Sequence, residues 1–122
     1  MDPVKASAPW PIPAESKRIN EEKEHYRQIK YVWHRDGWRY EARWHTQTHG
    51  ARIVTYLSWR LDRVKAGKGY GEDHAPRVSE ILVGDHWLPT KQVRYAARQV
   101  NSGVASIEAV NIIRQAHWPD KN

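Results

Sequence analysis

The 122-residue chain contains no cysteine and no phenylalanine, and no apolar run approaches the ~18 residues that a membrane-spanning helix needs. Without cysteine, disulfide bonds, thiolate zinc sites and cysteine nucleophiles are excluded. The N-terminal residues also lack the apolar stretch of an ordinary signal peptide. Acidic residues are scarce, 14 against 20 lysines and arginines, so the formal net charge is +6. The chain is therefore expected to meet a polyanionic partner and not a membrane.

The length and the hydrophobic content indicate a single domain. A chain of this size buries roughly two thirds of its unfolded surface. Only 39% of the residues are hydrophobic, so the seven tryptophans must supply much of the core. Four of the seven prolines lie within residues 1–14, where alternating prolines block a helix. We predict a leader over 1–14, either a linker or an arm packed through Trp10, and one basic domain over 15–122.

Three segments have the sequence signals of helices. Residues 15–30 are rich in helix formers and contain no glycine or proline, which predicts a surface helix. A second helix is expected to begin with Thr90 as N-cap and to end at 101–103, and Ser106 is expected to cap a third. The apolar stripe of the second helix consists of Val93, Ala96, Ala97 and Val100. The third helix is expected to bury Ile107, Val110 and Ile113.

Between these helices, alternating residues predict antiparallel strands. A short strand at 31–34 and a hairpin turn at Asp36-Gly37 precede the clearest signal, a strand at 38–45. Its apolar side carries Trp38, Tyr40, Ala42 and Trp44, and its polar side carries Arg39, Glu41, Arg43 and His45. Further strands are expected at 53–61, 77–83 and 86–88. We predict an α+β fold, with a small antiparallel sheet of 4–5 strands and with one N-terminal and two C-terminal helices packed on its apolar face.

The polar side of the strand at 38–45 carries residue types that suit RNA cleavage without a metal. In that reaction a base accepts the 2′-hydroxyl proton, an acid protonates the leaving oxygen, and cations stabilise the phosphorane. His45 or Glu41 is the candidate base, and His49 is the candidate acid. The candidate phosphate ligands are Arg43, Arg52 and Arg60. A solvated strand face with no catalytic role gives the same pattern.

The two histidines of this region, His45 and His49, do not match a metal-binding motif. They are four residues apart, but across the junction of a strand and a loop, and the helical His-Glu-x-x-His arrangement is absent. We therefore predict no metal and no other cofactor.

Further basic and aromatic residues are candidates for binding nucleic acid. The segment 65–76 lacks the phosphate-loop pattern G-x-x-x-x-G-K-[ST], so nothing supports nucleotide hydrolysis. It is either a flexible solvated loop or a backbone-binding loop in which Tyr70 stacks on a base. The full set of nucleic-acid-binding candidates is Arg39, Arg52, Lys65, Lys68, Tyr70, Arg94 and Arg98.

Three functions are compatible with these residues. The first is a ribonuclease that uses the polar strand side. The second is a nucleic-acid-binding module without catalysis, whose affinity depends on salt. The third is a protein-interaction domain with exposed tryptophans, because tryptophan is enriched at binding hot spots.

One segment, Trp44-His45-Thr46-Gln47-Thr48-His49-Gly50-Ala51, resembles the W-H-T-R-T-P-G-A-P motif of C-terminal modules of bacterial polymorphic toxins. In the same order along the chain, Ser58-Trp59-Arg60-Leu61-Asp62-Arg63 is similar to the pattern T-W-x-[VIL]-x-R. The closing G-T-A-T and G-H-W phrases are similar to Gly103-Val104-Ala105-Ser106 and Ala116-His117-Trp118-Pro119. The resemblance covers about Trp38 to Pro119, and His49 departs from it by replacing a proline.

The resemblance implies a C-terminal toxin domain that is secreted as part of a larger effector and acts in the cytoplasm of a target cell. If the chain is not exported, the expected location is the cytoplasm of the producing cell. It also implies an immunity protein as partner, and nuclease activity is common among such modules. The matched positions to carry over are His45, Thr46, Thr48, Arg60 and His117. Thr48 and His117 thereby join the candidate catalytic residues.

Overall fold

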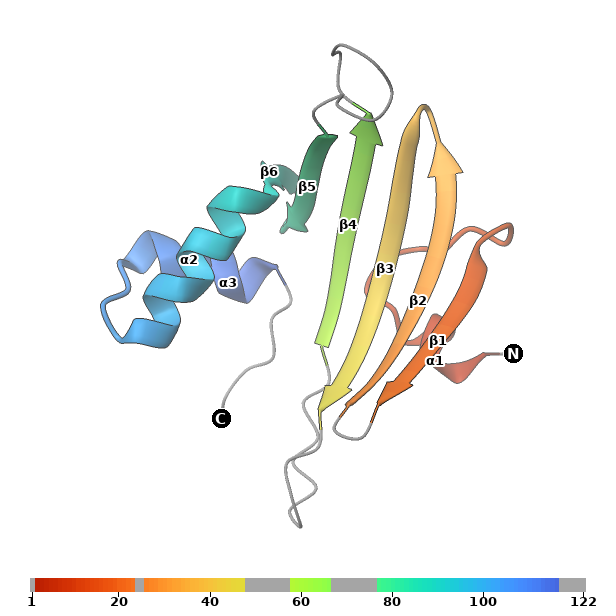
Figure 1. Ribbon diagram of the computed structural model, residues 1–122, viewed down its shortest axis with the longest axis horizontal. Helices are drawn as coiled ribbons and strands as arrows, with labels where there is room; N and C mark the ends of the chain where they lie inside the picture. Colours follow the sequence, from red (N-terminus) through yellow and green to blue (C-terminus); the bar gives the residue numbers. More distant parts are fainter. Residues whose placement is uncertain (1, 24–25, 48–57, 67–76, 117–122) are drawn as a thin grey trace.

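The computed structural model describes residues 2–23, 26–47, 58–66 and 77–116 (Figure 1). In chain order, the elements are α1 (Pro3–Ala6), β1 (Lys17–Lys23), β2 (Tyr26–Arg35), β3 (Trp38–Gln47), β4 (Ser58–Ala66), β5 (Arg77–Val83), β6 (His86–Pro89), α2 (Thr90–Ser102) and α3 (Ile107–Gln115). The described strands form one antiparallel sheet in the order β1-β2-β3-β4-β5-β6. The predicted α+β class with an antiparallel sheet is confirmed, although the sheet has six strands in place of 4–5.

The helix predicted over 15–30 is wrong, because this segment forms β1 and the start of β2. Helix propensities differ by only tenths of a kcal/mol per residue for most residue types, so burial overrides them easily. Within β2, the alternate residues Ile29, Tyr31 and Trp33 are 4%, 2% and 6% exposed. The charges of β1 have a separate explanation, because β1 is an edge strand of the sheet. Charged side chains on an edge strand prevent pairing with another chain.

The turn predicted between β2 and β3 is confirmed. Asp36 has a φ of 53° and Gly37 a φ of 81°. Positive φ at both central residues is the requirement of a type I′ hairpin turn. β3 follows over ten residues and is longer than predicted, because Thr46 and Gln47 continue it.

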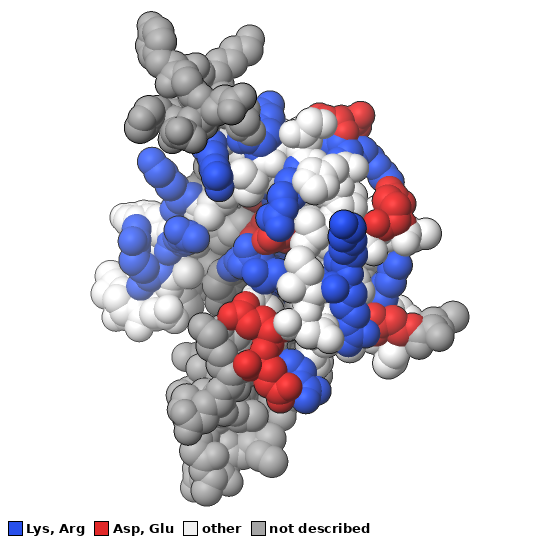
Figure 2. Space-filling view, turned by 45° about the vertical axis from the view of Figure 1, so that its right-hand side comes forward, with Lys and Arg blue, Asp and Glu red and all other residues white. Residues whose placement is uncertain are grey.

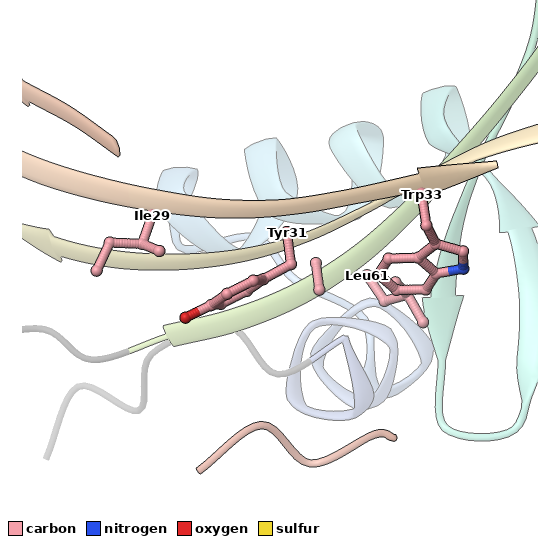
Figure 3. Packing of buried hydrophobic residues seen from close by; sticks show 5 residues of the cluster. Ile29, Tyr31, Trp33 and Leu61 are labelled. Carbon is pink, nitrogen blue, oxygen red and sulfur yellow. The ribbon is translucent and has the colours of Figure 1, made fainter. Parts of the chain in front are cut away.

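The main core lies on the apolar face of the sheet. Ile29, Tyr31 and Trp33 extend from β2 to the same side as Leu61 of β4 (Figure 3). This face is covered by the N-terminal segment, whose Val4, Trp10 and Ile12 pack against the cluster. The Trp10 ring meets the Trp59 ring edge-on, with 6.2 Å between their centroids. Of the two alternatives for residues 1–14, these contacts are those of an arm packed through Trp10.

Side chains at the chain start fasten this arm to the sheet. Asp2 accepts hydrogen bonds from the backbone N–H groups of Val4 and Lys5 and so caps α1. Its carboxylate also accepts a hydrogen bond from the Tyr31 hydroxyl and forms a 2.6 Å ion pair with Arg18. Burial and the Asp2 contact raise the pKa of Tyr31 to about 12. The phenol therefore remains a hydrogen-bond donor across the physiological range.

The two C-terminal helices pack on the opposite face from the predicted one. Val93 of α2 and Ala116 after α3 form a second core with Ile81 and Val83 of β5. Ile81 pairs with Asp62 of β4, and paired residues of an antiparallel sheet point to the same side. The helices therefore lie over the β5–β6 end of the polar face, beyond β4 (Figure 1). The prediction was wrong because alternation shows that a strand has two faces but not which element covers each.

The helix ends were predicted in part. Ser106 caps α3 as expected, with its hydroxyl 3.1 Å from the N–H of Ala109, and Gly103 ends α2 with a φ of 78°. Thr90 is not the N-cap of α2, because its hydroxyl lies 2.6 Å from the Ser79 hydroxyl instead. Ile107, expected to be buried, is 82% exposed, because α3 turns Ala109 toward the core in its place.

Candidate functional site

The predicted polar row of β3 lies beside polar residues of β4 on the same face. Glu41 pairs with Asp62, and Arg43 pairs with Arg60. Together with Arg39 they form an ion-pair network, which we call the sheet network. Figure 2 shows a small acidic area enclosed by basic side chains near the middle of the visible face, in agreement with this network.

Glu41 lies at the centre of the sheet network, with only 11% of its side chain exposed. One carboxylate oxygen lies 2.6 Å from Arg39 Nη1, and the other lies 2.6 Å from Arg43 Nη2 and 3.1 Å from Arg43 Nε. Burial raises the pKa of the Glu41 carboxyl, but hydrogen bonds and positive charge from Arg43 and Arg39 outweigh burial. The net effect is a pKa below the usual 4.5. A carboxylate that is held in this way is a weak proton acceptor, so the geometry favours a role in fixing arginines over the role of base.

Asp62 is the second carboxylate of the sheet network, and sequence reasoning missed it. Arg60 Nε lies 2.9 Å from its Oδ1, and Arg43 Nη2 lies 3.4 Å from its Oδ2. Arg43 therefore bridges Glu41 and Asp62. The spacing of two residues between Arg60 and Asp62 is a signal that could have identified Asp62, because such residues share one face of a strand. Within the described part of the network, three arginines, Arg39, Arg43 and Arg60, share two carboxylates.

His45 continues the polar row beyond Arg43, toward the end of β3. It is half-buried, and it is paired with Gln28 of β2 and Ser58 of β4. Burial, followed by the positive charge of Arg60, lowers the pKa of His45 below its ordinary 6.5. The imidazole is therefore mainly neutral at pH 7, and neutral imidazole is the form that can accept a proton. Of the two candidate bases, His45 has the environment that a base needs.

The structure places the other predicted site residues in three groups. Lys65 lies in β4 and not in a loop, with its Nζ 4.5 Å from the Trp38 ring centroid on the apolar face, opposite to His45. Arg94 and Arg98 are exposed on α2, as expected. The remaining predicted site residues lie outside the described residues, namely Thr48, His49, Arg52, Lys68, Tyr70 and His117.

The described tryptophans form packed contacts and are not exposed. Trp38 and Trp87 enclose the guanidinium of Arg63, which lies 4.1 Å from each ring centroid. The same guanidinium forms a 2.7 Å ion pair with Glu80. Within the described part of the chain, these rings stabilise the sheet and leave no exposed tryptophan for a partner protein.

The described residues show neither a metal site nor a membrane-spanning helix. They contain no group of three or more histidine, aspartate or glutamate side chains placed to hold a metal ion. No helix in the same ranges is long and apolar enough to cross a membrane. Comparison with family models, with curated proteins and with solved structures gives no match for this chain.

Proposed function

We propose that this chain is a toxin-type ribonuclease domain that cleaves RNA by acid–base catalysis without a metal. The observation that supports the proposal most directly is the position of His45, a neutral imidazole on the same face as Arg43 and Arg60. A base beside guanidinium groups is what cleavage at a 2′-hydroxyl requires.

In the proposed reaction, His45 accepts the proton of the 2′-hydroxyl while the 2′-oxygen attacks the neighbouring phosphorus. The bond from phosphorus to the 5′-oxygen breaks, and that oxygen takes a proton from an acid. His49 is the sequence candidate for the acid. The negative charge that develops on the phosphorane is stabilised by guanidinium groups of the sheet network.

The register of the sheet also favours an anion at this place. Arg43 and Arg60 are directly opposed across β3 and β4, and like charges in that position are destabilising. Asp62 compensates part of this repulsion through its contacts with both arginines. A phosphate on the solvent side of the pair would reduce the repulsion between Arg43 and Arg60 further. Guanidinium groups bind phosphate through paired hydrogen bonds.

The resemblance to polymorphic toxin modules supports the cellular part of the proposal. In that setting a larger effector delivers the domain into the cytoplasm of a target cell, and an immunity protein neutralises it in the producing cell. Controlled expression in bacteria tests this part. We expect growth arrest with degraded RNA for the wild type and normal growth for His45→Ala; unaffected growth with the wild type would contradict the toxin assignment.

Cleavage of a synthetic RNA by the purified chain tests the chemistry. We expect His45→Ala to lower the rate by about 100-fold or more, the ordinary contribution of a general base. His86→Ala is the matched control, because His86 is an exposed histidine at the start of the edge strand β6. The control should keep the wild-type rate, and thermal unfolding should show that both variants fold.

The dependence of the same reaction on pH and on chelators separates the alternatives. Because protonated imidazole accepts no proton, the rate should fall on the acidic side with a midpoint below 6.5. A chelator should leave the rate unchanged. Salt-sensitive RNA binding without any product would replace the ribonuclease with a non-catalytic binding module.

A further inference from the structure

The helix α2 belongs to a part of the chain without acidic residues. No aspartate or glutamate occurs between Asp85 and Glu108, whereas α2 contains Lys91, Arg94 and Arg98. Their spacing of i, i+3 and i+7 places them on one side of the helix. All three side chains are exposed. The exposed side of α2 is therefore a positively charged stripe, which we call the α2 stripe.

The cations of the α2 stripe have no partner within the described structure. Arg39, Arg43 and Arg60 each form ion pairs with a carboxylate. No hydrogen bond or ion pair among the described residues involves the side chains of the α2 stripe. Their positive charges are consequently available to a ligand.

The α2 stripe does not stabilise its own helix. Lys91 lies in the first turn, where a positive charge opposes the helix dipole, and the last turn, where a positive charge is favourable, has no basic residue. Arg94 and Arg98 are four residues apart, where like charges repel. The arrangement therefore costs the fold stability and is more readily explained by an anionic ligand.

An exposed aromatic ring lies among these charges. Tyr95 is 57% exposed, follows Arg94 directly, and is separated from Lys91 by four residues and from Arg98 by three. Residues three or four apart on a helix are neighbours on its surface, so the ring and the cations share one side. Basic groups for the backbone and aromatic rings for the bases are the two components of single-strand binding surfaces.

The α2 stripe is accessible from the same side of the molecule as the sheet network. α2 packs through Val93 against Ile81, which lies on the polar face with Glu41 and Asp62. Figure 2 shows basic side chains on the helical part and on the sheet from a single direction. A polyanionic chain lying on α2 can therefore continue toward His45.

We propose that the α2 stripe and Tyr95 bind single-stranded RNA, with phosphates on Lys91, Arg94 and Arg98 and one base stacked on Tyr95. The single strand is the favoured occupant because the bases of a duplex are already stacked and paired and offer no free face to a tyrosine. The inference rests on the proposed function in one respect: the single-stranded RNA bound by α2 is taken to be the substrate that reaches His45.

Binding of a fluorescent 2′-O-methyl oligouridylate to the full chain, followed by anisotropy, tests the inference. This probe has no 2′-hydroxyl and is not cleaved. We expect Tyr95→Ala to weaken binding about tenfold, in the range of a lost base–aromatic stack, and Tyr95→Phe to keep it. Arg98→Gln should weaken binding several-fold. The matched control is Arg35→Gln, which removes one charge from an exposed arginine that pairs with Glu15 on the far side of the sheet.

Two results with the single-stranded probe would overturn the inference. One is unchanged binding by Tyr95→Ala, and the other is an equal loss in Arg35→Gln and Arg98→Gln. A duplex that binds as tightly as the single strand, with no dependence on Tyr95, would also contradict it. Failure of the proposed function gives a different pattern: the wild type then binds the probe through Tyr95 but cleaves no RNA. His45→Ala should bind the probe like the wild type.

Discussion

The sheet network and the α2 stripe both contain arginines, but the arginines have opposite environments. In the sheet network, Arg43 contacts Glu41 at 2.6 Å and Asp62 at 3.4 Å, and both carboxylates are buried. In the α2 stripe, Arg94 and Arg98 are exposed and have no carboxylate partner within the described residues. The arginines of the sheet network therefore stabilise the fold, whereas the cations of the α2 stripe remain available to a ligand.

This difference explains why the net charge of +6 says little about where an anion binds. A charge that is already neutralised by a hydrogen-bonded carboxylate attracts a phosphate weakly. In the sheet network, three arginines share two carboxylates. The α2 stripe has three positive charges that contact no described carboxylate, which suits the backbone of an extended nucleic-acid strand.

The largest effect is expected when the sheet network loses its central carboxylate. Glu41→Gln removes the buried carboxylate that contacts both Arg39 and Arg43, and it leaves Arg43 only its longer contact with Asp62. We expect the free energy of unfolding to fall by about 2–3 kcal/mol, because one partner of a buried ion pair is removed. A denaturant titration measures the change. The control Glu108→Gln, at an exposed glutamate of α3, should cost less than about 1 kcal/mol, and an equal cost at both positions would break the comparison.

A smaller effect is expected from pH. The pKa of Glu41 is lower in the folded protein than its usual 4.5, so its contribution to stability is complete above pH 4.5 and is lost as the pH falls through the folded-state pKa. Wild-type stability should therefore decline in this acid range. Unfolding titrations of the Glu41→Gln variant should show a shallower decline, and parallel curves would contradict this assignment.

The smallest effect on stability is expected from the α2 stripe. Arg94→Ala removes no ion pair, relieves repulsion with Arg98 and introduces a better helix former. We expect the free energy of unfolding to change by less than about 0.5 kcal/mol, in the direction of a gain. A loss above about 1 kcal/mol in the denaturant titration would show that Arg94 supports the fold.

The parts of the fold that were predictable depend on local signals. The turn at Asp36-Gly37, the alternation of β3 and the caps at Gly103 and Ser106 follow from neighbouring residues. The conversion of 15–30 into strands and the face covered by the helices depend on pairing between distant segments. Helix propensity and alternation carry no information about such pairing.

The candidate site was predictable to a similar extent. The alternation placed Glu41, Arg43 and His45 on one face, which the structure confirms. It did not show that Arg43 and Arg39 occupy both oxygens of Glu41, because the hydrogen-bonding state of a carboxylate depends on side-chain geometry. Tyr95 lay within a predicted helix and outside its predicted apolar stripe, but the structure was needed to show that its ring is exposed beside three cations.

The salt dependence of binding tests the central claim most directly, since it counts the cations that meet phosphate. For the 2′-O-methyl oligouridylate, replacing Lys91, Arg94 and Arg98 together by glutamine should reduce the slope of log K against log salt by about 2, at roughly 0.7 for each phosphate contact on a single strand. An unchanged slope would contradict the account. So would an equal reduction in the matched triple variant, in which glutamine replaces the exposed residues Lys17, Arg18 and Arg35.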